Sequence, residues 1–300
     1  MHRLRSVPIR VAVACVAQLL ALGACSPDAP ARSASALVDD FGDTIVAAPA
    51  SRIVSLSPTT TELLFAIGAG TRLVGRTTYD VWPTAALAVP DLGPGIRPNV
   101  EAILGAHPDL VVLYASEDNR DAALRLRSAG IRTVSFRVDR IADFLRVTKA
   151  LGAITGDTAG ARVTVDTVTA TLSRVRAATA ALPRPTVFWP LWESPLLSVG
   201  GGSFLDELLD VAGAANVYHA LPQPSPTVTL EDLVRRDPDV VLASAPLGQR
   251  MRADPRWKTL RAVRDGHVLA FDSMIVNGPS PRVGASAVAL AQLFHPGVVH

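Results

Sequence analysis

Two stretches of the chain repeat one pattern: "VEAILGAHPDLVVL" at 100–113 and "LEDLVRRDPDVVL" at 230–242. They share a Glu, two apolar positions, a Pro-Asp pair and a closing apolar run at the same spacing. Each predicts a short helix that begins near Glu, a turn, and a buried strand. Because the two segments occupy corresponding places in the two halves of the chain, we interpret them as parts of two equivalent units.

Helical and strand patterns alternate at short intervals in both halves, and "LVVLY" and "DVVLAS" are continuous apolar runs. Such runs are typical of parallel strands that helices cover on both faces. The spacing of Thr59 and Glu62 indicates a capping box at the start of an early helix. Between 155 and 183 no strand pattern intervenes, and one long helix is predicted from apolar residues at close to helical spacing: Val163, Val165, Val168, Leu172 and Val175.

The predicted fold class is therefore α/β, with two Rossmann-like lobes joined by one long rigid helix and a ligand cleft between the lobes. The boundaries that we expect are 37–154 for the N-terminal lobe, 155–183 for the interlobe helix and 184–300 for the C-terminal lobe.

Residues 1–24 are predicted to be a signal peptide, because three Arg precede the apolar run "VAVACVAQLLALGAC". That run ends in Leu-Gly-Ala-Cys, which resembles a lipobox and predicts lipidation at Cys25, followed by a flexible tether over 25–36.

Charge and cysteine content exclude several classes of function. Loss of residues 1–24 removes three Arg and no acid, so the formal net charge falls from +2 to −1. A nearly neutral mature protein has no electrostatic footprint for nucleic acid. The two cysteines are Cys15, in the signal, and Cys25, so the mature domain is expected to have no disulfide and no thiol chemistry.

No catalytic or metal-binding motif stands out. The chain has no G-x-S-x-G elbow, no Walker A sequence and no G-x-G-x-x-G fingerprint. Ser203 with Asp206 is interpreted as a helix N-cap with an acidic first turn. None of the six His forms a metal-ligand pair; His219 is the one that would matter if it converged with acids in the cleft. We therefore expect no enzyme, no metal and no intrinsic cofactor.

Scarce aromatic residues follow several predicted strands. Tyr79 and Trp82 lie in "TTYDVWP", Tyr114 ends "DLVVLY", and Trp192 follows the first strand of the second half. Flat apolar faces with few rotatable bonds suit a large, partly apolar ligand. Trp189 lies within a strand pattern, and we expect it in the core.

Six segments together resemble the periplasmic binding proteins of iron-siderophore and vitamin B12 ABC importers. They are "RIVSLSPTTTELLFAIGAG", "VGRTTYDVWP", "NVEAILGAHPDLVVLY", "SVGGGSFLDELLDVAGAANVY", "VTLEDLVRRDPDVVL" and "GPSPRV". The resemblance runs from about Arg52 to the C-terminus, and the chain most resembles the cobalamin-binding branch. It implies a two-lobed protein in which Tyr79 and Tyr114 contact a corrinoid and Arg282 lies near the cleft. With Trp82 and Trp192 from the aromatic pattern, these are the expected ligand-binding residues.

The resemblance also implies partners. In such importers one acidic residue on each lobe docks into an Arg pocket on each permease subunit, and Glu101 and Glu231 match these positions. The expected protein is an exported, lipid-anchored monomer that delivers vitamin B12 to an ABC permease dimer and its ATPase. In a diderm cell its location would be the periplasm. Haem and ferric siderophores remain open as ligands, and an anchored enzyme, a metal-site protein or a sensor remains an alternative function.

Overall fold

The computed structural model describes residues 37–45, 47–271 and 278–298, which belong to one contact unit. The predicted signal peptide, the lipidation site at Cys25 and the tether lie outside the described residues. Two short strands open the described chain, β1 (Leu37–Val38) and β2 (Thr44–Ile45), which pair antiparallel. In the part of the chain that the structure describes, no helix is both long and apolar enough to cross a membrane.

The first half builds a four-stranded parallel sheet in the order β4-β3-β5-β6. Its strands are β3 (Ile53–Ser55), β4 (Leu73–Gly75), β5 (Leu110–Tyr114) and β6 (Arg132–Phe136). Its helices are α1 (Pro58–Ile67), α2 (Val100–Gly105), α3 (Glu117–Ser128) and α4 (Ile141–Thr155), and short 3₁₀ turns span Gly70–Arg72 (η1) and Thr84–Ala88 (η2). Alternate residues of β5 face opposite cores: Val111 packs with α2 and α3, and Val112 packs with α1 and α4.

The second half repeats this arrangement, with a parallel sheet in the order β10-β7-β11-β12. Its strands are β7 (Thr186–Phe188), β10 (Ala215–Asn216), β11 (Val240–Ala243) and β12 (Val268–Ala270). Its helices are α6 (Phe204–Val211), α7 (Leu230–Arg236), α8 (Ala245–Ala253), α9 (Arg261–Arg264) and α10 (Val283–Phe294). Apart from an added hairpin, β8 (Pro190–Glu193) with β9 (Leu196–Ser198), both sheets use their strands in the chain order second, first, third, fourth.

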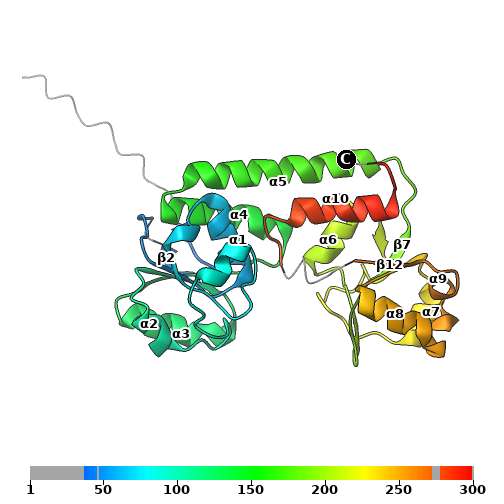
Figure 1. Cartoon of the computed structure of the whole chain (residues 1–300), viewed down its shortest axis with the longest axis horizontal. Helices are drawn as coiled ribbons and strands as arrows, with labels where there is room; N and C mark the ends of the chain where they lie inside the picture. Colours follow the sequence, from blue (N-terminus) through cyan, green and yellow to red (C-terminus); the bar gives the residue numbers. More distant parts are fainter. Residues whose placement is uncertain (1–36, 46, 272–277, 299–300) are drawn as a thin grey trace, which may run out of the picture. The chain divides into compact units, whose positions relative to one another are not determined.

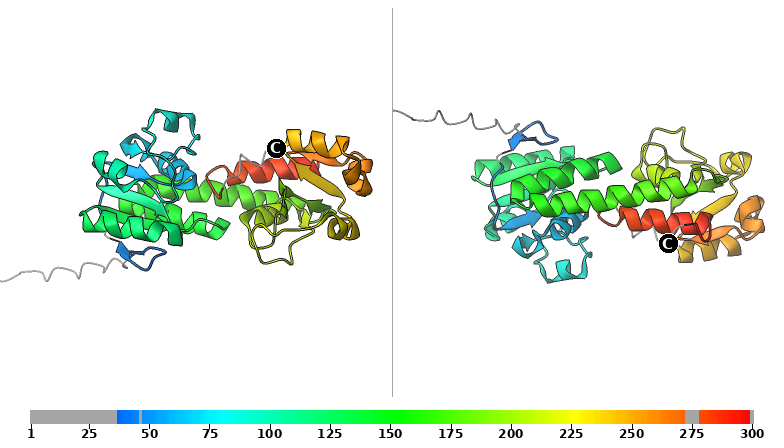
Figure 2. Two further views of the ribbon diagram at one scale, coloured as in Figure 1. Left: turned by 90° about the horizontal axis from the view of Figure 1, so that it is seen from below. Right: turned by 90° about the horizontal axis from the view of Figure 1, so that it is seen from above.

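The long helix α5 (Thr158–Thr179) lies within the predicted 155–183. Its buried face recurs at helical spacing and consists of Ala161, Thr164, Val165, Val168, Leu172, Val175 and Thr179. Val163, which the sequence pattern had included, lies on the other face and is 60% exposed. Helices α1, α4, α6 and α10 pack against α5, and both views of Figure 2 show α10 beside it.

The predicted α/β class with parallel sheets in two lobes is confirmed. One local prediction is wrong. The capping box at Thr59 and Glu62 does not form, because α1 starts at Pro58, with Ser57 rather than Thr59 as N-cap. Between β11 and β12 a 3₁₀ turn, η3 (Pro255–Thr259), precedes the separate helix α9.

Candidate functional site

A pocket of about 400 Å³ lies between the two halves of the molecule. The first half contributes Tyr114, at the end of β5, together with Val138 and Asp139, which follow β6. The other half contributes Leu191, Gly202, Ser203, Phe204, Leu205, Pro224, Ser225, Gly278 and Pro279. The carboxyl ends of parallel strands are the usual ligand edge of such sheets, so this pocket matches the predicted cleft.

A second compartment of about 370 Å³ adjoins the first at Tyr114, which lines both. Its other lining residues come from the first half: Leu56, Ser57, Pro58, Thr77, Tyr79, Pro94, Gly95 and Ile96. Gly95 is needed here, since a Cβ at this position would lie 2.2 Å from the backbone oxygen of Leu56. The two compartments therefore form one binding region in which Tyr114 is central.

The Tyr114 hydroxyl donates a hydrogen bond to Asp139 Oδ1 at 2.7 Å. Burial, and then the bond and charge of Asp139, raise the pKa of Tyr114 to about 12. The phenol is therefore neutral at physiological pH. It offers a ligand an aromatic face rather than an anionic oxygen.

A buried carboxyl positions the loop that carries Tyr79 and Trp82. Asp80 is fully buried and accepts hydrogen bonds from the hydroxyls of Thr61 and Thr77 and from the Thr77 backbone N–H. Burial outweighs these bonds and raises the pKa of Asp80 above its usual value. With Asp80 held inside, Tyr79 and Trp82 remain 65% and 48% exposed, and Tyr79 reaches the second compartment.

Arg282 is engaged within the protein. Its guanidinium binds both carboxylate oxygens of Glu62 in α1, at 2.9 and 2.6 Å, and lies 5.4 Å from the ring centre of Trp82. Neither Arg282 nor Trp82 lines the two compartments. The Arg282–Glu62 pair thus fastens the start of α10 to the first half of the chain.

The predicted Trp192 does not line the cleft. Leu191 lines the interlobe pocket, at a register irregularity of β8, whereas Trp192 is 62% exposed and donates from Nε1 to the Ser194 carbonyl. Trp189 is in the core, as predicted: it is fully buried, with its ring 5.6 Å from that of Phe271 in an edge-on contact.

The two predicted docking residues each lie in the first turn of a short helix. Glu101 is in α2, after the N-cap Asn99, and Glu231 is in α7, after the N-cap Thr229. Both helices lie on the side of the molecule away from α5 (Figure 1). Both carboxylates are exposed, and that of Glu101 binds Arg125 at 2.7 Å. Within the described residues, the Glu231 side chain has no hydrogen-bond or ion-pair partner.

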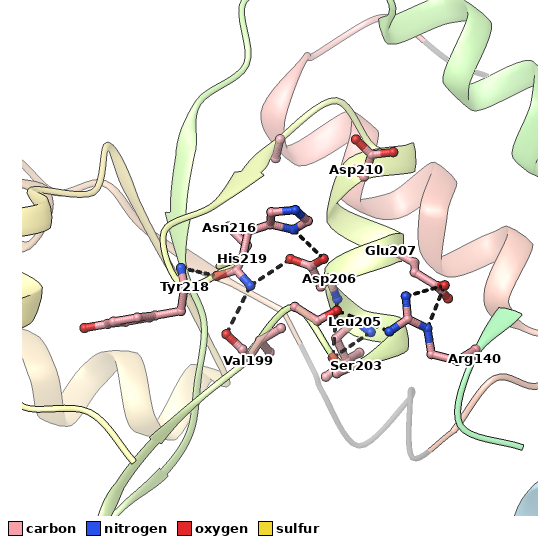
Figure 3. Close-up of polar contacts among 12 residues, drawn as sticks. Arg140, Val199, Ser203, Leu205, Asp206, Glu207, Asp210, Asn216, Tyr218 and His219 are labelled. Atoms are coloured by element: carbon pink, nitrogen blue, oxygen red, sulfur yellow. Dashed lines mark hydrogen bonds and ion pairs between the residues drawn. The ribbon is translucent and has the colours of Figure 1, made fainter. Parts of the chain in front are cut away.

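A separate pocket of about 380 Å³ lies among α4, α5 and α6, and Figure 3 shows its polar contacts. Arg140, before α4, binds Glu207 of α6 at 2.8 Å and the Gly201 carbonyl at 3.2 Å. The other Glu207 oxygen accepts the Ile141 backbone N–H at 2.9 Å. This contact links the two halves, since α4 belongs to the first and α6 to the second.

His219 meets one acid in this pocket. Its Nδ1 lies 2.8 Å from Asp206 Oδ2, and Asn216 donates to Asp206 Oδ1 at 2.9 Å (Figure 3). Ser203 caps α6, as predicted, by accepting from the Leu205 and Asp206 backbone N–H groups. His219 does not line the interlobe compartments, and across the described residues no group of three or more His, Cys, Asp or Glu is placed to hold a metal ion.

Sequence reasoning missed three residues: Asp139 lines the cleft, Asp80 holds the loop of Tyr79, and Arg140 links the two halves in the separate pocket. Asp80 carries a weak sequence signal, since it is an acid between two aromatic residues in a loop. The partners of Asp139 and Arg140 are 25 and 67 residues away, and one sequence gives no sign of these pairs.

Comparisons with known proteins agree with this geometry. Residues 53–274 match the family model described as periplasmic binding protein. A cobalamin-binding protein of Halobacterium salinarum is 27% identical and aligns over 98% of this chain and 86% of its own length.

Two solved structures share the fold. The periplasmic vitamin B12 binding protein of Vibrio cholerae has a TM-score of 0.72 at 24% identity, over 82% of this chain and 96% of its own. The periplasmic heme-binding protein of Roseiflexus sp. RS-1 has a TM-score of 0.73 at 21% identity, over 82% and 98%. Since the family model covers well over half of the sequence, the chain belongs to the periplasmic binding protein family, the class of substrate-binding proteins that work with ABC importers.

Proposed function

We propose that this chain is the substrate-binding component of an ABC importer and that it captures a corrinoid, vitamin B12, in the cleft around Tyr114. The observation that carries this proposal is the chemistry of the cleft wall. Of the lining residues that the structure describes, Asp139 is the only charged one; the rest are aromatic, aliphatic, Pro, Gly, Ser or Thr. A corrinoid is a broad macrocycle with apolar faces and a rim of amides, and it needs flat contacts and hydrogen bonds more than a cation.

The competing ligands fit this wall less well. Haem carries two carboxylates and many ferric siderophores are anionic, so both gain from Arg or Lys in the site. The described lining offers neither. A tyrosine can ligate haem iron as its anion, but the Tyr114 hydroxyl donates to Asp139 and would have to give up this bond. The haem-binding neighbour shares the fold, which leaves haem as the second candidate.

On this basis we assign ligand contacts to Tyr114 and Tyr79, which line the compartments, and to Trp82, which follows Tyr79 in the same loop. Trp192 stays assigned from the aromatic pattern and Arg282 from the family resemblance, and each would have to turn toward the cleft or act through a neighbour. Trp192 can do so through the exposed β8–β9 hairpin, whereas Arg282 would act through Glu62 and Trp82.

Delivery requires docking to the permease. The exposed carboxylates of Glu101 and Glu231 are suited to Arg pockets on the two permease subunits, because one lobe then faces each half of a two-fold partner. We further assign export by the N-terminal signal, anchoring through lipid on Cys25, action as a monomer, and an ATPase as the permease's partner. The membrane and the permease are the expected partners, and nucleic acid is not.

The test is a titration of the full-length chain, purified in mild detergent, with cyanocobalamin, haemin and a ferric siderophore. Cyanocobalamin should bind with a Kd of about 1 μM or tighter, which corresponds to about −8 kcal/mol. Haemin and the siderophore should bind more weakly. Clear binding of haemin or siderophore without binding of cyanocobalamin would replace the ligand and keep the family.

A further inference from the structure

Asp139 has a feature that the ligand assignment leaves unexplained: it is a carboxylate in an otherwise uncharged cleft. We propose that Asp139 determines which ligands the cleft accepts, by receiving an N–H of a peripheral amide and by repelling ligands that carry carboxylates at that position. This inference rests on the proposed function and makes it more specific. It names the group by which the cleft discriminates between a macrocycle with peripheral amides and one with peripheral carboxylates.

The geometry leaves one oxygen of Asp139 available to a ligand. Oδ1 accepts the Tyr114 hydroxyl at 2.7 Å. Oδ2 lies 3.8 Å from Arg137 Nε, which is too far for a direct hydrogen bond. The side chain is 44% exposed and lines the interlobe pocket. A carboxylate oxygen has room for about two donors, so Oδ2 can accept a ligand N–H without giving up a bond inside the protein.

The position of Asp139 is fixed from two sides. Its backbone N–H donates to Asp143 Oδ2 at 3.2 Å, which ties the residue to the first turn of α4. Tyr114 holds the carboxylate from β5. A preorganised acceptor discriminates between donors and acceptors more sharply than a flexible one, because little conformational freedom is lost on binding.

The opposite wall does not offset the charge of Asp139. Gly202, Ser203 and Ser225 face it from the second half, and Ser203 Oγ is already used to cap α6. The nearest base, Arg137, is itself 60% exposed and donates to the Ala115 carbonyl, so water screens its effect on the cleft. A ligand carboxylate next to Asp139 would therefore meet a like charge without a compensating cation among the described lining residues.

The test compares the full-length chain with Asp139→Asn, using cyanocobalamin, monocarboxylate derivatives in which one peripheral amide is an acid, and haemin. In the wild type, at least one monocarboxylate should bind about tenfold more weakly than cyanocobalamin, which corresponds to about 1.4 kcal/mol. In Asp139→Asn that ratio should fall to about twofold or less, and haemin should bind more tightly than to the wild type.

Two controls separate this role from a general loss of structure. Asp166→Asn makes the same charge change on the exposed face of α5, away from both compartments, and should leave every ratio unchanged. Asp139→Asn should also lower the pKa of Tyr114 in a phenolate absorbance titration, because the anion that holds the phenol neutral is gone.

The possible results decide the inference separately from the proposed function. If cyanocobalamin does not bind the wild type, the proposed identity of the ligand is wrong. The change in haemin affinity on Asp139→Asn then tests the selecting role of Asp139. Tighter haemin binding to Asp139→Asn supports the charge-selecting role in either case. An unchanged monocarboxylate ratio with cyanocobalamin, or no gain for haemin when cyanocobalamin fails to bind, overturns it.

Discussion

Each half of the molecule contains a helix, a Pro-Asp turn and a strand in succession. The two segments have the same fold, but different side chains stabilise them. In each, a residue with positive φ ends the helix before Pro: His107 at 49° and Asp237 at 43°. Two residues later an Asp binds the neighbouring strand. Asp109 accepts from the Ser51 and Arg52 backbone N–H groups before β3, and Asp239 accepts from the Thr186 N–H of β7.

The difference lies in the arginine that completes each turn. In the first half Arg52, next to β3, donates to the Ala106 and His107 carbonyls and caps the end of α2. In the second half Arg261, from α9, binds the carboxylates of both Asp237 and Asp239 at 3.0 Å. Thr186 and then Arg261 lower the pKa of Asp239 to about 2. The first copy thus relies on hydrogen bonds to carbonyls, and the second on charge.

The comparison shows which parts of the repeat serve the fold. The Pro-Asp pair recurs because a carboxylate there joins the central strand to its neighbour in both sheets. The two glutamates take no part in this. Glu101 binds Arg125 on α3, and Glu231 has no partner among the described residues. We therefore expect changes at the two glutamates to affect transport, and changes at the two Asp to affect stability.

The largest expected effect is on transport. The double variant Glu101→Ala, Glu231→Ala should abolish corrinoid uptake by cells that depend on this chain, because both Arg pockets of the permease lose their carboxylate. Affinity for cyanocobalamin should not change. Uptake of labelled cyanocobalamin and a binding titration measure the two quantities.

The matched control is Glu117→Ala, which removes an exposed acid of α3 whose partner among the described residues, Arg120, lies on the same helix. It should transport normally. A loss of ligand affinity in the double variant would contradict the docking role of the glutamates.

A smaller effect is expected on stability. Asp239→Ala should lower the free energy of unfolding by about 1–2 kcal/mol, because the Thr186 N–H and Arg261 lose a charged acceptor, and partial exposure of the site limits the loss. Asp109→Ala should cost less, since its carboxylate is exposed and, in the described chain, accepts from the Ser51 and Arg52 backbone N–H groups rather than from a guanidinium. Urea denaturation of the ligand-free chains gives both values. A larger loss of unfolding free energy for Asp109→Ala than for Asp239→Ala would contradict this prediction.

Acid should remove the contribution of Asp239. Its pKa is lower in the folded chain, at about 2, than the value of about 3.9 usual for an unfolded chain. Its stabilisation is therefore complete above about pH 4 and is lost as the pH falls through about 2. The stability difference between wild type and Asp239→Asn, followed by urea denaturation, should be constant from pH 7 to 5 and shrink below about pH 4. A difference that grows on acidification would refute this.

The smallest effect concerns Arg125. Arg125→Ala frees Glu101 from an exposed ion pair and should leave the thermal midpoint nearly unchanged. Docking should strengthen by less than about threefold, measured as binding to the purified transporter at low salt, because the carboxylate no longer has to leave a partner. Weaker docking would instead place Arg125 in the permease contact.

The pattern of strands and helices could be predicted from the sequence because burial on both faces leaves apolar runs such as Leu110–Tyr114. The strand end at Tyr114 was predicted for the same reason. The direction of the side chains after the strand ends was not predicted: Leu191 lines the cleft and the next residue, Trp192, does not, at a register irregularity of β8 that one sequence does not reveal. The pairing of Glu62 with Arg282 joins residues 220 positions apart, so local spacing suggested a helix cap instead.

The most direct test of the central claim is a crystal structure of the chain with cyanocobalamin bound. We predict that the corrin ring lies against Tyr114, with one peripheral amide on Asp139 Oδ2 and contacts from Ser203 on the opposite half. A ligand in the pocket beside Asp206 and His219, or on the outer surface with Tyr114 uncovered, would contradict the account.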